Sequence, residues 1–423
     1  MKSKILVVGG GITGLVAAYR LLQKNYQVTL VEKSDSLGGL LGGFKINNVN
    51  LEKAYHHIFK NDKEILALIK ELGLEKKLKW YESKTALYYE GKMYPFGGAL
   101  DLLKFKPLNL IDKLRLGLVK IYLEKENNWQ KFENILAFEW MKKWCGDRAY
   151  RVVWEPLLKG KFNNRYQDIS MAWMWARIHT RANSSEKGRE YLGYMDGGFQ
   201  LIIDELEKRI KELGGKIELN TNLPPRELGT SLEEGRLKSF DRVISTAPLS
   251  NVDYLGAVTV VFKSKQSLSP YYWHNINDIK SPFLALIQHT NLVGKENYGG
   301  KNIYYLGTYL PQNHKYFTCK DNLIEKDFFG YLKKIFSEFN EKEIEEKFVF
   351  KFKDAQHIVI KNYKEKINPS RPQSSPNPFF DKTGRKNYLE NKIIQANFAM
   401  IYPEDRGINY AVREGEKAAA LIL

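Results

Sequence analysis

The sequence has few cysteines and no long uncharged apolar run. Among its 423 residues are two cysteines, Cys145 and Cys319, which stand far apart and outside any C-x-x-C pattern. This usage indicates a reducing compartment and predicts no metal site. No uncharged apolar stretch is long enough to span a bilayer, so we expect no transmembrane helix. A core-strand pattern begins at Lys4, which leaves no room for a signal peptide and predicts a cytoplasmic protein.

Acidic residues are also scarce relative to basic ones. The chain has 66 Lys and Arg against 49 Asp and Glu, for a formal net charge of +17. Such a surplus is typical of a lysine-rich solvated surface, or of attraction to an anionic partner such as a phosphorylated substrate or a membrane. No zinc-finger, ribonucleoprotein or basic-zipper signature is present, so nucleic acid is excluded as the preferred partner.

A strand–turn–helix–strand unit fills residues 4–32. The apolar run Ile5–Val8 predicts a buried strand, and it leads directly into the turn Gly9–Gly14. A helical pattern follows, and Gln27–Val31 predicts a second strand. Glu32 then stands at the strand end, where a carboxylate accepts hydrogen bonds from both ribose hydroxyls of a dinucleotide and disfavours NADP.

The turn itself fits the binding of a dinucleotide. Gly9 permits the tight turn, Gly11 leaves room for a pyrophosphate at the backbone, and Gly14 lets the helix pack close to the strand. A helix that begins with Ile12 and Thr13 directs unpaired N–H groups and a positive dipole end at the phosphates. The unit therefore predicts a dinucleotide site.

The residues that follow Glu32 resemble those of a known family. Glu32, Lys33 and the pair Gly38-Gly39 are similar to the flavin-containing amine oxidase superfamily, which includes protoporphyrinogen oxidases, phytoene desaturases and, more distantly, UDP-galactopyranose mutases. The resemblance favours FAD over NAD and implies that Lys33, Gly38 and Gly39 lie along the cofactor.

Later segments carry the same resemblance. Glu155–Phe162 resembles the segment that closes the family's helical substrate region, and Asp241–Pro248 its D-x-V-I-x-T-x-P strand. Residues 392–410 resemble the closing motif, with Ala396-Asn397 where the family has Gly-Asp. No cysteine lies at 320–423, so we expect noncovalent FAD. The resemblance implies cofactor contacts at Leu223, on the adenine, at Asn397, and at Arg406, Gly407 and Ile408, beside the flavin pyrimidine.

The expected fold class is α/β, with a discontinuous Rossmann-type FAD-binding domain and a substrate domain made of an antiparallel sheet and helices. We assign residues 1–80, 194–250 and 385–423 to the FAD-binding domain. Residues 81–193 and 251–384 form the substrate domain, with its helical part at about 99–193. Residues 99–126 predict two helices broken at Pro107, and residues 321–347 predict a pair of charged amphipathic helices.

Candidate catalytic residues are those expected near the flavin ring. They are His56, His57, His289 and Gln356. Either of the adjacent histidines His56 and His57 is a candidate proton relay, because histidine titrates near neutrality. The alternative is that both are hydrogen-bonding spacers beneath the cofactor, and that the residues around His289 satisfy local backbone groups.

The leading interpretation is an FAD-dependent oxidoreductase of the amine oxidase or protoporphyrinogen oxidase kind, which takes a hydride from a C–H or C–N bond of a small or lipid-like substrate. The first alternative is a UDP-galactopyranose mutase-like, non-redox flavoenzyme that acts on a nucleotide sugar, because His57-Ile58-Phe59 resembles the H-I-F of that family. The second alternative is a flavoprotein that has lost its catalytic activity and serves as a binding module. Residues 99–126 are either ordinary packed helices or a basic amphipathic surface for the inner face of a membrane. The sequence predicts no oligomeric state.

Overall fold

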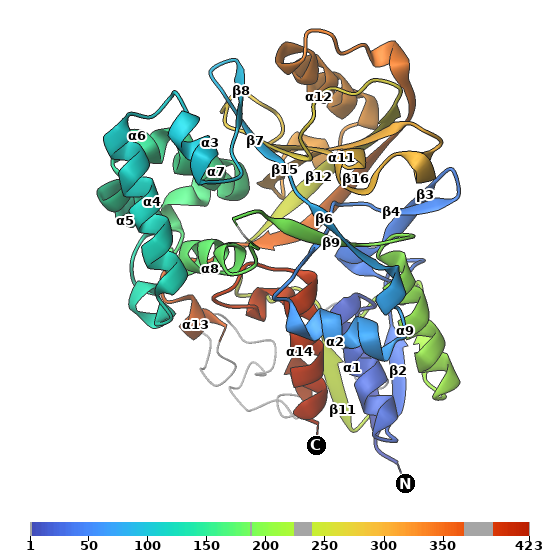
Figure 1. The fold of residues 1–423 in the computed structure, drawn as a ribbon. Coiled ribbons are helices and arrows are strands. Elements are labelled where there is room, and N and C mark those ends of the chain that lie inside the picture. Colours follow the sequence, from blue (N-terminus) through green and yellow to red (C-terminus); the bar gives the residue numbers. More distant parts are fainter. Residues whose placement is uncertain (1, 187, 224–238, 368–391, 423) are drawn as a thin grey trace.

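A five-stranded parallel sheet joins segments from the two ends and the middle of the chain. The computed structural model describes residues 2–186, 188–223, 239–367 and 392–422. In the sheet the order is β10-β2-β1-β11-β17, and every pairing is parallel. The strands are β1 (Lys4–Val8), β2 (Gln27–Val31), β10 (Lys216–Glu218), β11 (Arg242–Ser245) and β17 (Ile393–Gln395). Both ends of the chain lie at the same edge of the molecule (Figure 1).

Helices pack on this sheet because each carries an apolar stripe. Helix α1 follows β1 directly, and its buried face joins those of the neighbouring helices in one core. The helices are α1 (Ile12–Gln23), α2 (Lys63–Glu71), α9 (Gln200–Glu212) and α14 (Ile408–Ala420). α14 lies beside α1 so closely that a Cβ on Gly415 would stand 2.5 Å from the Thr13 carbonyl oxygen.

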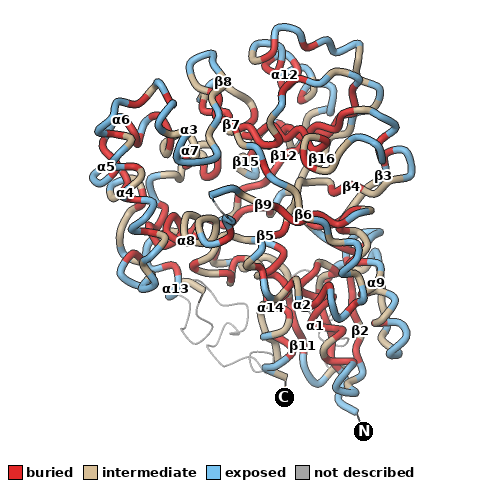
Figure 2. The backbone as a smooth tube through the Cα atoms, viewed as in Figure 1, coloured by how far each residue is buried: buried red, intermediate tan, exposed pale blue. Residues whose placement is uncertain are grey.

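A seven-stranded sheet forms the second half of the molecule, in the order β16-β12-β15-β14-β13-β7-β8. Its neighbours are antiparallel, apart from the parallel pair β13 and β7. The strands are β7 (Thr85–Tyr89), β8 (Lys92–Pro95), β12 (Tyr254–Ser264), β13 (Trp273–Ile276), β14 (Ala285–Gln288), β15 (Asn302–Pro311) and β16 (Ile344–His357). Helix α12 (Asp321–Ile335) packs on this sheet through a shared aromatic core. Buried residues lie in the two sheets, in the helices packed on them and in the helical region around α8 (Figure 2).

A helical subdomain is attached to one side of the large sheet (Figure 1). Its helices are α3 (Ala99–Lys104), α4 (Leu110–Lys125), α5 (Ala137–Cys145), α6 (Asp147–Ala149), α7 (Glu155–Phe162) and α8 (Met171–Ala182), with a π-helical turn at Tyr150–Trp154. Trp173 and Phe162 are fully buried where these helices meet. α7 and α8 are the two helices that reach toward the centre of the molecule.

Small sheets connect the two halves. β3 (Gly43–Ile46) pairs with β4 (Val49–Glu52), and β9 (Tyr191–Met195) pairs with both β5 (Ile58–Phe59) and β6 (Leu78–Glu82). Two short α-helices in the described ranges are α11 (Thr290–Val293) and α13 (Tyr363–Lys366), and one of several 3₁₀ turns spans Phe398–Met400.

The α/β class, with a parallel sheet assembled from distant segments and a mostly antiparallel sheet with helices beside it, is confirmed. The exact domain boundaries stay a prediction, and the one at 384–385 lies outside the described residues. The pair of helices expected at 321–347 is wrong in its second half, because β16 begins at Ile344. The alternating side chains Phe348, Phe350 and Phe352 continue this strand beside β12, and this pairing overrides the helical character of the charged residues before it.

Candidate functional site

One cavity is lined by both halves of the molecule. Its volume is about 1650 Å³, larger than the roughly 300–1,000 Å³ of common small-molecule pockets. The parallel-sheet half contributes the glycine turn after β1, the segment after β2 and the start of α14, whereas α7, α8, β13 and β15 line the other side. There is room for a dinucleotide and a second molecule side by side.

The glycine turn has the geometry that a close-lying phosphate group requires. A Cβ on Gly11 would meet nothing within 4 Å, so the backbone there faces open cavity. Gly9 has a φ of +106°, and a Cβ on Gly14 would stand 2.0 Å from the Gly9 carbonyl oxygen. Gly39, of the second glycine pair, lies next to this turn, since a Cβ on Gly39 would stand 3.3 Å from the Gly11 Cα. The turn therefore leaves a shallow cradle that side chains would fill.

Two helix amino ends meet at this cradle. α1 begins after Gly11 and α14 begins after Gly407, and neither helix has a side-chain cap at that end. The Thr13 hydroxyl donates to the Ala411 carbonyl oxygen at 3.0 Å, which ties the two first turns together. Uncapped amino ends carry free N–H groups and a positive dipole end, so this corner of the cavity favours an anion.

The acid at the end of β2 is held by backbone N–H groups. The Glu32 carboxylate accepts from Gly10 N at 2.6 Å and from Ser34 N at 2.9 Å while it borders the cavity. Asn397 is buried at the far wall, where its Oδ1 accepts from the Tyr254 hydroxyl at 3.0 Å. Both side chains are thus fixed before any ligand binds.

Nearly all of the predicted cofactor residues border this one cavity, and these residues together fit an adenine dinucleotide. They are Gly9, Gly11, Ile12, Thr13, Glu32, Lys33, Gly38, Gly39, Leu223, Asn397, Arg406, Gly407 and Ile408. Gly14 lies behind them, where it serves the packing of α1. That each of them contacts FAD stays a prediction.

The adjacent histidines both border the cavity. His56 Nδ1 lies 2.6 Å from the Ala54 carbonyl oxygen, so Nδ1 carries the proton and donates, and Nε2 remains an acceptor. His57 Nδ1 has no hydrogen-bond partner among the described residues. Burial lowers the pKa of His56 to about 4 and that of His57 to about 3, with Arg181 adding to the effect at His57. Both imidazoles are therefore neutral near pH 7.

The other two catalytic candidates do not border the cavity. His289 is buried among tyrosines, and its Nε2 lies 3.0 Å from the Tyr298 hydroxyl. Gln356 lies behind Arg406, accepting from its Nε at 3.1 Å and donating to the His357 carbonyl oxygen at 2.9 Å. Gln356 therefore positions a cavity residue, and His289 supports the core.

A buried carboxylate anchors the segment that leads to the histidines. Glu52 accepts from the Phe199 backbone N–H at 2.7 Å and from the Tyr194 hydroxyl at 2.9 Å. Burial raises the pKa of Glu52 to about 7, and the two hydrogen bonds offset only part of the effect. The folded state therefore holds this proton more tightly than the unfolded chain does.

We expect Glu52 to make stability depend on pH. Because its folded pKa lies above the unfolded value, the free energy of unfolding falls as pH rises from about 4.5 to about 7. Glu52→Gln keeps the shape and the acceptor for Phe199 but cannot ionise. In this variant the fall in the free energy of unfolding over this pH range should therefore be smaller by up to about 3 kcal/mol. Urea unfolding at about pH 5 and pH 8 measures it. Glu207→Gln, on the solvent side of α9, is the control, and equal pH slopes in all three proteins would refute the prediction.

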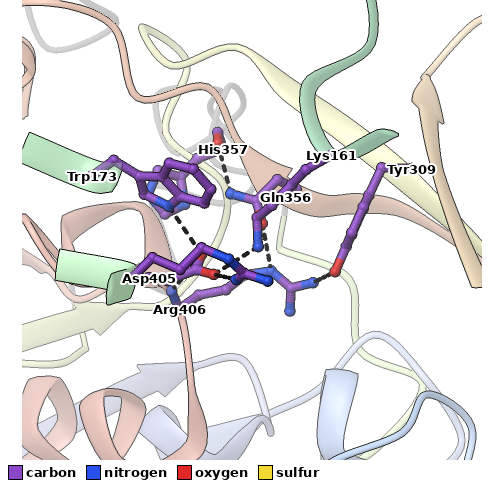
Figure 3. Close-up of polar contacts among 8 residues, drawn as sticks. Lys161, Trp173, Tyr309, Gln356, His357, Asp405 and Arg406 are labelled. Atoms are coloured by element: carbon purple, nitrogen blue, oxygen red, sulfur yellow. Dashed lines mark hydrogen bonds and ion pairs between the residues drawn. The ribbon is translucent and has the colours of Figure 1, made fainter. Parts of the chain in front are cut away.

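A second carboxylate, Asp405, whose side chain is 18% exposed, organises the opposite wall (Figure 3). It contacts Lys161 Nζ at 2.7 Å and Arg177 Nη1 at 2.8 Å, and it accepts from Trp173 Nε1 at 3.2 Å. The two cations hold the pKa of Asp405 well below its usual range despite burial. Burial lowers the pKa of Lys161 to about 7, and its ammonium lies between the rings of Trp173 and Tyr309.

Two further arginines border the cavity without a carboxylate. Arg406 donates to Gln356 and, through Nη2, to the Tyr309 hydroxyl at 2.6 Å. The Arg181 guanidinium lies over the rings of Phe59 and Trp273, one turn along α8 from Arg177. In the part of the chain that the structure describes, no carboxylate is within ion-pair distance of either one. This wall therefore has more positive than negative groups.

Sequence reasoning missed Asp405 as the centre of this wall. Its partners Lys161 and Arg177 are more than two hundred residues away in the chain, so no local pattern links them. The one available signal was the adjacent acid and base at Asp405-Arg406, immediately before a glycine that starts a helix.

The parallel sheet carries a dinucleotide cradle, and the half made of the large sheet and the helices faces it across one cavity. This arrangement is that of the FAD-dependent oxidoreductases. The family model of flavin-containing amine oxidoreductases matches residues 12–287, and the chain belongs to this family. Membership confirms the predicted family and the predicted FAD cofactor.

Individual proteins are similar over different lengths. The coproporphyrinogen III oxidase of Mycobacterium tuberculosis is 25% identical over 225 residues, covering 48% of this chain and 50% of that protein. The chain thus spans about half the length of the curated relatives it matches. A protein from Exiguobacterium sp. 255-15 assigned as a protoporphyrinogen oxidase has a similar structure, with a TM-score of 0.74 and 18% identity over 100% of this chain and 99% of that one. Reduced UDP-galactopyranose mutase has a TM-score of 0.72 and 16% identity, over 100% and 95% of the two chains. These structures share the fold.

Proposed function

We propose that this chain binds FAD noncovalently in the cavity and oxidises a small or lipid-like substrate at a C–H or C–N bond. The observation that carries the proposal is the meeting of two uncapped helix amino ends at a cradle opened by Gly11, with a separate wall of functional side chains across the same cavity. A bound flavin would supply the hydride acceptor for this oxidation, with oxygen or another compound as the final electron acceptor.

Residues of the chain itself bind the cofactor, orient it and shield the site from water. The free N–H groups at the start of α1 bind the diphosphate, and Glu32 orients the adjacent ribose. The start of α14, tied to the start of α1 by the hydrogen bond from Thr13 to Ala411, adds a second positive helix end at the same corner of the cavity. Trp273 and Tyr309 narrow the cavity on the substrate side and exclude water.

A neutral histidine is available to relay a proton. Nδ1 of His57 has no partner among the described residues, and Nε2 of His56 is its acceptor atom, because Nδ1 donates to Ala54. Their lowered pKa values keep both imidazoles unprotonated near pH 7. Because the same lowered pKa values disfavour the imidazolium form, either one passes on a proton that leaves the substrate rather than keeping it.

The test is to mix flavin-loaded protein, without oxygen, with representative polyprenoids, porphyrinogens, amines and nucleotide sugars. We expect one class to bleach the absorbance of the oxidised flavin, and readmitted oxygen or a dye acceptor to restore it. If no compound that can be oxidised bleaches the flavin, the redox proposal fails.

A second function is favoured by the cationic wall. Lys161 and Arg177 pair with Asp405, and Arg181 and Arg406 border the same cavity. Paired arginines suit a diphosphate, so we also propose a non-redox rearrangement of a nucleotide sugar. Chemically reduced protein incubated with UDP-galactopyranose should then form its ring isomer without net consumption of reductant. Absence of the isomer counts against this candidate only.

A further inference from the structure

Helix α4 has two apolar faces, of which the protein covers one. Leu116, Val119 and Leu123 are buried against the neighbouring helices. On the opposite side of the helix, Ile111 and Leu118 are 68% and 67% exposed. An ordinary surface helix is polar on its solvent side, so the exposed face of α4 lacks a partner.

The same surface extends along α3. Leu103 lies beside the first turn of α4, because its carbonyl oxygen accepts from Lys113 Nζ at 2.7 Å. The α3–α4 apolar surface comprises Leu100, Leu103, Leu110, Ile111, Leu114, Leu118, Ile121 and Tyr122. Of the fourteen exposed large apolar side chains in the described ranges, eight belong to it. Such a concentration marks an interaction site. None of its eight residues lines the cavity.

Basic side chains border this surface. The exposed cations on α3, on α4 and in the turn between them are Lys104, Lys106, Arg115, Lys120 and Lys125. Among the acidic groups nearby, Asp112 is buried, Asp101 accepts from the Gly97 backbone N–H at 2.9 Å, Glu126 pairs with Lys131, and Glu124 is half-buried. An apolar strip with a basic border is complementary to the interface of a membrane that carries anionic lipids.

We propose that the α3–α4 apolar surface rests on an anionic lipid bilayer, with its leucines among the acyl chains and its lysines at the head groups. A second copy of the chain is the less favoured occupant, because a two-fold contact through this surface brings the two basic borders together. Among the described residues no helix is both long and apolar enough to cross a membrane. The contact is therefore peripheral, and it does not depend on the reaction proposed above.

The experiment is flotation of the flavin-loaded full chain with vesicles of phosphatidylglycerol and phosphatidylcholine. We expect the wild type to float with these vesicles, and much less with pure phosphatidylcholine or at about 0.5 M salt. Leu114→Gln with Leu118→Gln should weaken partitioning by about tenfold or more, because both side chains leave the acyl region. Leu323→Gln with Ile279→Gln changes two exposed apolar residues elsewhere and should float like the wild type.

Two measurements keep the outcomes separate. Thermal unfolding and retained flavin absorbance establish that each variant is folded, and Lys104→Gln with Lys120→Gln tests the charge border with every leucine in place. The proposal is overturned if the wild type does not float. It is also overturned if the double variant of Leu114 and Leu118 floats as well as the double variant of Leu323 and Ile279. If light scattering shows a dimer that only Leu114→Gln with Leu118→Gln abolishes, and no variant alters flotation, the occupant is a second copy and the lipid proposal is likewise overturned.

Discussion

Replacing Gly11 with aspartate should yield a folded protein that no longer retains FAD. The backbone of Gly11 has φ −72° and ψ 172°, which any residue adopts without strain, and a Cβ there meets nothing in the protein. An aspartate at this position directs its carboxylate into the cradle where we place the diphosphate. Two unit charges about 4 Å apart repel by about 4 kcal/mol at an effective dielectric constant of about 20. We therefore expect the Kd for FAD to rise by at least about 100-fold.

The measurement is titration of the flavin-free protein with FAD, followed by quenching of flavin fluorescence. Gly11→Ala adds volume without charge and should give an intermediate loss of affinity. Gly330→Asp is the matched control, because Gly330 also has an open Cβ direction and lies in α12, away from the cavity. Wild-type affinity in Gly11→Asp would place the phosphates elsewhere and remove the basis of the proposed cofactor site.

Gly11 was predictable because its constraint is local. The strand Ile5–Val8, the turn and Glu32 are contiguous, and each has one physical reason for its residue type. The same logic held at the start of α14, where Gly407 precedes an uncapped helix. Resemblance to a family extended the site to Leu223 and Asn397, which no local pattern would have joined to it.

Other features depended on contacts between distant residues and could not be derived in this way. His289 follows a strand that was expected at the flavin, yet its ring packs against Tyr194 and Tyr298 in the core, because strand alternation does not say which face the fold covers. The first four residues of β16, 344–347, were predicted to be helical for a related reason. The charged residues among them match a helical face, and only pairing with β12 makes the extended form the more stable one.

Asp405 is the clearest example of a site built from distant parts, and removing its charge should have the second large effect. In Asp405→Asn the shape is kept, but the positive charges of Lys161 and Arg177 lose the carboxylate that compensates them. Breaking a buried ion pair by removing one partner costs about 3–5 kcal/mol. We expect a loss of this size in urea unfolding. We also expect the pKa of Lys161, lowered to about 7 in the wild type, to fall further.

The exposed Asp147, with Lys142 at 3.2 Å and Arg151 at 2.6 Å, supplies a control that also has two cationic partners. Asp147→Asn makes the same chemical change in water, where such a pair contributes at most about 1 kcal/mol. Adding Lys161→Met to Asp405→Asn should recover part of the lost stability, because the folded protein then no longer has to bury or deprotonate the Lys161 ammonium, and the volume of its stem is kept. If Asp405→Asn and Asp147→Asn cost the same, Asp405 does not organise the cationic wall. Recovery of stability in the double variant would show that the loss comes from buried positive charge. The same positive charge would attract an anionic group of a substrate.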